Sequence, residues 1–143
     1  MYYNTSMSST QSILLKAFNK HLFEFIDDMI MFFPENDDLN KSRAYLETIK
    51  SANPTMLAKI WHKFIYTPYH TQIESGDLQF FFEKDYSHDI QQVPNSEKII
   101  QAIDNTLREP LRNMDDANLD KCRKHLQLVT AICAKYKGEI GSS

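Results

Sequence analysis

Glycine is scarce in this chain of 143 residues, which contains only three of them. All-β folds usually need more glycine in their turns, so the scarcity favours helices. Three glycines also cannot form the glycine-rich loop that cradles phosphates in many nucleotide-binding proteins. The composition therefore predicts an all-α fold and excludes a phosphate loop of that kind.

Long apolar runs are also missing from the sequence. Residues 23–33 come nearest, but Glu24, Asp27 and Asp28 interrupt them, and about 20 apolar residues are needed to cross a membrane. The start of the chain is polar and rich in Ser and Thr, so no signal peptide is predicted. We therefore expect an intracellular protein without a membrane partner.

Cysteine is limited to Cys122 and Cys133, which lie eleven residues apart on one predicted helix. Eleven residues correspond to about 16 Å along a helix axis, so the two thiols cannot form a disulfide with each other without breaking the helix. Both fall on inward-facing positions, where a thiolate would be desolvated and inert. We predict two reduced, buried thiols without a catalytic role.

Neither sign of charge dominates, and the formal net charge of −3 argues against a general, salt-driven nucleic-acid binder. None of the five histidines shares metal-site spacing with another His, Cys, Asp or Glu. The adjacent carboxylates of Asp27-Asp28 and Asp115-Asp116 do not converge, because successive helical residues project about 100° apart. Asp27-Asp28 is expected to be a solvated strip and Asp115-Asp116 a helix cap. These patterns predict no metal, no cofactor and no enzymatic activity.

Apolar residues are abundant enough for one core, at 42% hydrophobic and 12% aromatic. They are densest in residues 13–33, where a 3-4-3-4-3 spacing is typical of one buried helical face. The face positions are Leu15, Phe18, Leu22, Phe25, Met29 and Phe32, and the remaining polar strip contains Lys16, Asn19, Lys20, Asp27 and Asp28. We predict a central helix over residues 11–33, ended by Pro34, with other helices packed around it.

Two shorter helices are predicted after the central helix, over residues 38–51 and 54–66. The acidic residues before the first of them are expected to form a turn and an N-cap. Asn53 suits the N-cap of the second helix, and Pro54 suits its first position. The apolar face of that second helix contains Trp61, the only tryptophan, which we expect in the core against the central helix.

The middle of the chain gives weaker signals. Pro68 and its neighbours break the helical pattern, residues 70–75 suit one more short turn, and Gly76 marks a helix end. Residues 78–82 contain three adjacent phenylalanines, which suit either a short strand or a helical face. A helix is favoured there because no partner strand is visible elsewhere.

The last third predicts a helix that begins at Ser96 and is bent or ended by Pro110. A final helix follows, capped by Asp115 or Asp116 and ended by Gly138. It repeats the 3-4-3-4-3 spacing of the central helix, at Leu119, Cys122, Leu126, Val129, Cys133 and Tyr136. Because the two repeats match in step and nearly in length, the two helices are expected to pack lengthwise.

The predicted architecture is therefore an all-α, single-domain bundle of about five to seven helices. It spans residues 11–138 and is organised around the central N-terminal helix. Residues 1–10 and 139–143 are expected to be tails.

Four blocks of the sequence resemble a known family. They are FNKHLFEFIDD and FPEND at residues 18–28 and 33–37; ANP, IW and PY at 52–54, 60–61 and 68–69; IESGD and FFEKDY at 73–77 and 81–86; and REPLRNM at 108–114. In order and spacing they are similar to a family of small helical proteins encoded by large nucleocytoplasmic DNA viruses of algae and protists. The resemblance covers about residues 18–137 and carries over no catalytic residues. It implies a viral protein in host cytoplasm, a viral factory or the virion.

We expect a non-enzymatic structural or protein–protein interaction protein. Its partner is another protein, viral or host, and a symmetric dimer through a leftover face of the central helix is a further hypothesis. The candidate contacts are exposed aromatic residues and an acidic turn, namely Tyr66, Tyr69, Tyr86, Asp37 and Asp38.

Two alternatives remain open. One is a nucleic-acid-associated factor in viral transcription, replication or packaging, which would use the basic residues of the last third. These are Arg108, Arg112, Lys121, Lys124 and Lys135. The other is an adaptor that redirects a host process such as translation.

Overall fold

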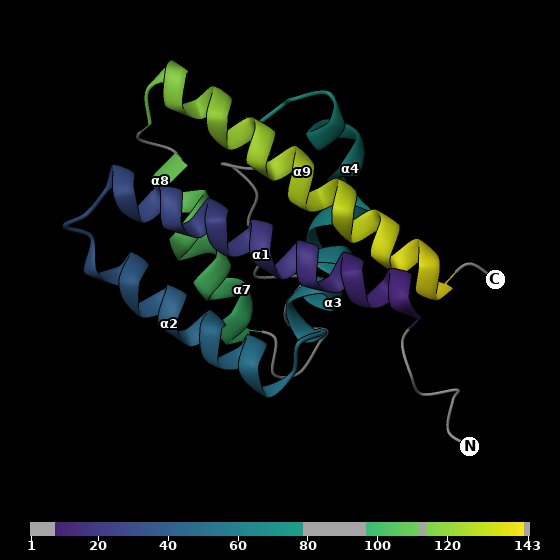
Figure 1. Ribbon diagram of the computed structural model, residues 1–143. Helices are drawn as coiled ribbons and strands as arrows, with labels where there is room; N and C mark the ends of the chain where they lie inside the picture. Colours follow the sequence, from purple (N-terminus) through teal and green to yellow (C-terminus); the bar gives the residue numbers. More distant parts are fainter. Residues whose placement is uncertain (1–7, 79–96, 112–113, 142–143) are drawn as a thin grey trace.

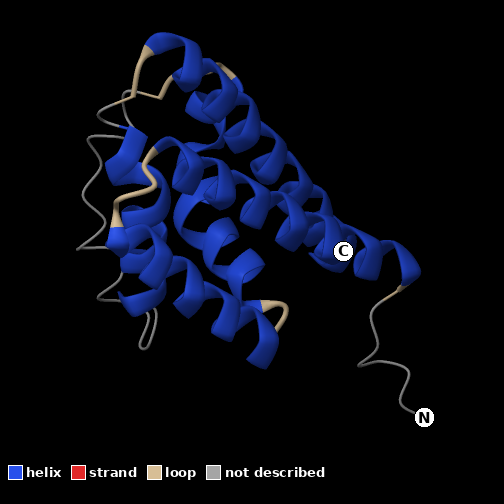
Figure 2. Ribbon diagram, turned by 60° about the vertical axis from the view of Figure 1, so that its left-hand side comes forward, coloured by secondary structure: helices blue, strands red, loops and turns tan. Residues whose placement is uncertain are grey.

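The computed structural model describes residues 8–78, 97–111 and 114–141 of the chain. In these ranges all regular structure is helical, in five continuous segments (Figures 1 and 2). The segments are α1 (Ser9–Phe32); α2 (Asp37–Ala52); α3, η2 and α4 (Met56–Trp61, His62–Tyr66 and Thr67–Glu74); α7, η3 and α8 (Glu97–Ile103, Asp104–Arg108 and Glu109–Leu111); and α9 (Asp116–Gly141). They pack around one core, which confirms the all-α, single-domain prediction.

Helix α1 begins at Ser9, two residues before the predicted start, because Ser8 forms a capping box. The Ser8 hydroxyl accepts the Gln11 backbone N–H at 3.0 Å, and the Gln11 side chain accepts the Ser8 N–H at 2.9 Å. The helix ends just before Pro34, at Phe32. Its predicted core face is buried from Leu15 to Met29, which makes it the centre of the bundle.

The last helix, α9, lies along α1 and runs in the opposite direction (Figure 1). This confirms the predicted lengthwise packing of the two helices. The inward positions of α9 are buried, as the 3-4 repeat predicts, at Cys122, Leu126, Val129, Cys133 and Tyr136. The helix continues through Gly138 to Gly141, so Gly138 is not a C-cap.

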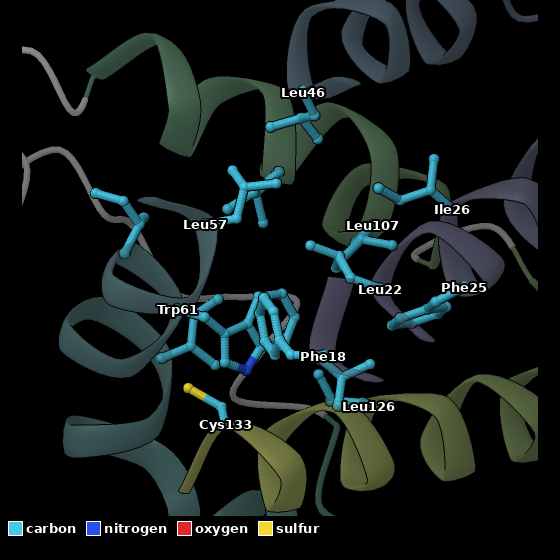
Figure 3. Close-up of a cluster of buried hydrophobic side chains, with 14 of the residues drawn as sticks. Phe18, Leu22, Phe25, Ile26, Leu46, Leu57, Trp61, Leu107, Leu126 and Cys133 are labelled. Atoms are coloured by element: carbon cyan, nitrogen blue, oxygen red, sulfur yellow. The ribbon is translucent and has the colours of Figure 1, made fainter. Parts of the chain in front are cut away.

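Trp61 lies at the centre of the core, as predicted (Figure 3). Its ring meets Phe18 of α1 edge-on, with centroids 6.1 Å apart. Its indole N–H donates to the hydroxyl of Thr130 in α9 at 3.1 Å. One side chain of α3 therefore contacts both long helices and has its only polar group satisfied.

Pro68 does not break its helix, contrary to the prediction. Proline cannot donate to the carbonyl four residues back, here that of Phe64, and its ring clashes with that carbonyl. The π-helical turn η2 ends two residues before Pro68 and widens the helix there. As a result, the N–H of the preceding residue, Thr67, donates to the carbonyl of His62, five residues back. The chain thus runs as one helical segment from α3 through α4.

Pro110 is accommodated in the same way. The π turn η3 precedes it, and the Glu109 N–H donates to the carbonyl of Asp104, five residues back. The helix continues to Leu111, which is buried. Both prolines thus lie two residues after the end of a five-residue π turn, a compensation that local sequence rules do not anticipate.

Two polar positions near the start of α3 differ from expectation. The helix begins at Met56 rather than Pro54, and the Asn53 side chain instead accepts from the backbone and hydroxyl of Thr55. Asn19 was expected in the polar strip of α1 but is buried, because its amide donates to the carbonyl of Pro54 at 3.0 Å. This bond joins the central helix to the turn between α2 and α3.

Gly76 ends α4 as predicted, with φ at +81°. The Asp77 N–H donates to the carbonyl of Gln72, and the Gly76 N–H to that of Ile73, which together form a Schellman motif. Leu78 follows as a buried, non-helical residue. The rest of the stretch predicted as helix over residues 78–82 lies outside the described residues.

Phe25→Asp should leave the protein largely unfolded at room temperature. The Phe25 side chain is fully buried, and the substitution both removes its packing and buries a carboxylate. We expect a loss of more than about 4 kcal/mol, measured by far-UV circular dichroism and urea titration.

Met31→Asp is the matched control, because Met31 is on the same helix and 75% exposed. Its unfolding free energy should stay within about 0.5 kcal/mol of the parent protein. Normal helicity and a normal urea midpoint for Phe25→Asp would contradict the burial of this face.

Candidate functional site

Two of the described hollows form a groove between α2 and α7, which we call the α2–α7 groove. Its first part, of about 390 Å³, is lined on the α2 side by Asp38, Lys41 and Tyr45 and on the other side by Lys98 and Gln101. A second hollow of about 600 Å³ shares Tyr45 and Lys98 with the first and continues to the end of α2. The two together make one open channel along α2.

Helix α2 is fixed against η3 beneath this groove. Ser42 is buried there, and its hydroxyl accepts from the side-chain amide of Asn105 at 3.4 Å. Leu39 and Leu46 are fully buried on the same side of α2. The groove walls are therefore held by the core rather than by surface contacts alone.

The predicted acidic residues are at one end of the groove. Asn36 caps α2, because its side chain accepts the N–H groups of Asp38 and Leu39 at 3.0 and 3.3 Å. Asp37 and Asp38 then occupy the first turn, where their charges complement the helix dipole. Of these two acids, Asp38 lines the groove, while both are exposed.

The predicted tyrosines are less exposed than expected. Tyr66 is half-buried and stacked between His62 and His70, at ring-centroid distances of 5.1 and 4.7 Å. Tyr69 is also half-buried and packs against the core. Tyr86 lies outside the described residues. Tyr66 and Tyr69 are on η2 and α4, apart from the α2–α7 groove, so the structure does not bring them together with Asp38.

His62, one of the two rings that stack on Tyr66, has a pKa shifted by its surroundings. Burial lowers the pKa of His62, and the nearby charge of Lys137 lowers it further. His62 is therefore held towards its neutral form. This favours a structural role for the three-ring stack.

The predicted basic residues share one exposed stripe of α9. Lys121, Lys124 and Lys135 are all exposed. They are 3 and 11 residues apart, a spacing that places all three on one side of the helix. The first two border a shallow hollow of about 310 Å³ together with His125 and Leu128. Lys124 also approaches Asp120 at 3.6 Å, which reduces the net positive charge there. The side chain of Arg108 and the whole of Arg112 lie outside the described part of the structure.

Asp27 and Asp28, predicted as a solvated strip, keep 53% and 40% of their side chains exposed, but each also contacts a side chain of another helix. Asp27 accepts from Arg43 of α2 at 2.6 Å, whereas Asp28 pairs with His125 of α9 at 2.6 Å. The His125 ring also stacks on Phe25 at 5.1 Å. Because adjacent helical residues diverge by about 100°, the two carboxylates reach opposite neighbours and join α1 to both of them.

Both cysteines are buried and free, as predicted. The Cys122 sulfur lies 3.4 Å from that of Met114, and the Cys133 sulfur lies 3.5 Å from the carbonyl of Ala58. Burial raises the pKa of each thiol to about 12, and the negative charge of Asp28 adds to the effect at Cys122. Neither thiol is suited to act as a nucleophile near neutral pH.

Residues 8–78, 97–111 and 114–141 contain no group of three or more His, Cys, Asp or Glu side chains that could hold a metal ion. None of the described helices is both long and apolar enough to cross a membrane. Comparison with protein-family models, with curated proteins and with solved structures gives no match. The geometry of the chain itself must therefore support any functional proposal.

The amino-acid sequence alone predicts neither the α2–α7 groove nor the partners of Asp27 and Asp28 on the neighbouring helices. Tyr45 and Ser42 are single polar positions on a helix with no motif around them. In the sequence, only their spacing indicates that they lie near one another on the same helix. The residue that binds Ser42 cannot be identified from spacing, because Asn105 is 63 residues further along the chain.

Iodoacetamide should alkylate Cys122 and Cys133 very slowly in the native protein at pH 8. With the pKa raised from 9.0 to about 12, the thiolate fraction falls roughly 1,000-fold. The rates are measured by mass spectrometry on native and denatured protein, and the single variants C122A and C133A assign them. A native thiol that reacts at the denatured rate would contradict its burial.

Proposed function

We propose that this protein works by binding a segment of another protein in the α2–α7 groove, without catalysing a reaction. The single observation that supports this is the open channel along α2, whose lining contains charged residues of both signs and the aromatic residue Tyr45. Small-molecule sites are usually enclosed and bury most of their ligand, whereas this channel is open along its length.

The length of the groove suits a helical or extended peptide. Its lining residues run from Asp38 to Asn53, which corresponds to about 22 Å along α2. A partner helix of four turns has the same length and would place anchors three and four residues apart along it. Helix-in-groove binding is therefore the recognition mode that best fits this surface.

The chemistry of the walls indicates what such a segment must contain. Lys41 and Lys98 provide positive charge, and Asp38 and Glu97 provide negative charge. Tyr45 is the aromatic residue that lines both hollows. A segment with apolar anchors and flanking charges of both signs would be complementary.

The resemblance to proteins of large DNA viruses supports placing this interaction in an infected cell. The partner would then be a virion component, a component of the viral factory or a host protein. The adaptor hypothesis is the case in which the bound segment belongs to the host.

A photo-crosslinking amino acid at Gln101, inside the groove, should attach to a partner polypeptide in cells that naturally contain the protein. The same amino acid at Lys63, exposed on η2, is the matched control and should give little product. The charge reversal K41E/K98E should lower the Gln101 yield about tenfold. Equal yields from both positions would contradict the groove as the binding site.

Nucleic-acid binding is the second candidate, supported by the exposed stripe with Lys121, Lys124 and Lys135 on α9. The stripe is interrupted by Leu128 and partly neutralised by Asp120. We rank it second because three lysines on a chain of net charge −3 give weak, salt-sensitive binding.

The triple variant K121E/K124E/K135E tests this second candidate in a gel shift at low salt. If the stripe binds nucleic acid, the parent protein should retard the probe, the variant should not, and the retardation should disappear as salt rises. Equal behaviour of parent and variant would remove this candidate.

A further inference from the structure

The outer face of α1 has a second regular pattern, separate from its buried face. Six positions follow a 4-3-4-3-4 spacing, which places them on one stripe of the helix. They are Ile13, Ala17, Lys20, Glu24, Asp27 and Met31. Five of the six are exposed, although Asp27, at the edge of the stripe, also pairs with Arg43 of α2, and Ala17 is half-buried. Figure 1 shows α1 between α9 and α2, so this stripe, the α1 outer stripe, is the surface of α1 that the bundle leaves uncovered.

Large apolar side chains are exposed at both ends of the α1 outer stripe. Ile13 is 66% exposed and Met31 is 75% exposed. In the described part of the chain one other large apolar side chain is exposed, Leu128 at 42%, and it is on the neighbouring helix α9. Ile13 and Met31 lie about 27 Å apart with charged residues between them, so they form no continuous apolar patch, and a contact surface is inferred from how the whole stripe pairs with itself.

The α1 outer stripe is complementary to itself when reversed. If a second copy lies antiparallel, with a twofold axis at the level of Leu22, residues whose numbers sum to 44 face each other. Ile13 then faces Met31 of the second copy, and Lys20 faces Glu24 of the second copy, each contact occurring twice. The spacing also matches the positions that pair across an antiparallel coiled coil.

We propose that two copies of this chain associate through antiparallel pairing of their α1 outer stripes. The surface is separate from the α2–α7 groove, so this inference goes beyond the proposed function and stands independently of it. A parallel arrangement would place Lys20 against Lys20 and Glu24 against Glu24. These like charges disfavour it, which selects the antiparallel dimer.

The two charged side chains that would pair between copies, Lys20 and Glu24, are accessible to a partner. Lys20 is exposed and has no ion-pair partner among the described residues. Glu24 is 49% exposed, and within the described ranges it forms a salt bridge with His21 of its own helix, at 3.0 Å. A Lys20–Glu24 pair between copies would engage the ammonium group of Lys20 and would leave the Glu24–His21 contact in place.

The available area predicts a weak, reversible dimer. The stripe from Ile13 to Met31 is about 27 Å long, and with α9 alongside the face is about 20 Å wide. About 500 Å² per copy, or about 1,000 Å² in total, is the lower limit for a specific interface. Dimers should therefore form in the micromolar range and dissociate on dilution.

Sedimentation equilibrium of the full chain with charge-swap variants tests the pairing. K20E and E24K should each raise the dimer dissociation constant about tenfold, because two symmetric pairs become repulsive. The double variant K20E/E24K should restore the parent value, since the swapped charges again face each other. Circular dichroism confirms that each variant is folded. A parent protein that stays monomeric at millimolar concentration, or a double variant no tighter than the single ones, would overturn the proposal.

Crosslinking with a short bismaleimide tests the register directly. A mixture of I13C and M31C should give covalent dimers, because these positions meet only between copies. I13C alone should not, since the two equivalent positions would be about 27 Å apart. Crosslinking of I13C with itself as strongly as in the mixture, or no product in the mixture, would overturn the antiparallel arrangement. Neither result depends on whether the α2–α7 groove binds a partner, so the two proposals can fail separately.

Discussion

The burial of α1 is the constraint on which the rest of the structure depends. Phe18, Leu22, Phe25, Ile26 and Met29 each have no exposed surface. Removing each such side chain from water stabilises the fold by about 1.5–3 kcal/mol, so the other helices must cover α1 on all but one side. Helix α9 covers one flank and α2 the other, and Trp61 closes the centre with Phe18 and Thr130.

This arrangement decides which surfaces are left for function. The pairs Asp27–Arg43 and Asp28–His125 join α1 to α2 and to α9, so the flanks of α1 are occupied. What remains is the outer stripe of α1 and the channel between α2 and α7. Both are formed by helices anchored in the core, which suits recognition by a preformed surface. In the described ranges His62 and His70 are stacked on Tyr66, His125 contacts Asp28, and both thiols are in the core.

Periodicity was sufficient to predict the two long helices, their lengthwise packing and the central place of Trp61, because apolar spacing reports which face of a helix is buried. It predicted a helix break at Pro68, which lies inside a helix, and it left open whether Pro110 bends or ends its helix, since each depends on a π turn that no residue preference indicates. The partners of Asn19, Asp27 and Asp28 were also missed. They lie 35, 16 and 97 residues away in the chain, and only the tertiary fold brings them close. The α2–α7 groove was missed as well. Among the described residues that were predicted as partner contacts, Asp38 lines it, whereas Asp37, Tyr66 and Tyr69 do not.

Native-state hydrogen exchange tests the central role of α1 most directly. If α1 is the buried spine, the amides of residues 15–29 should exchange only through global unfolding, together with those of residues 122–133 in α9. Their exchange free energies should equal the unfolding free energy measured in urea. Amides of α1 that exchange through a local opening several kcal/mol below that value, while α2 and α9 stay protected, would contradict the account.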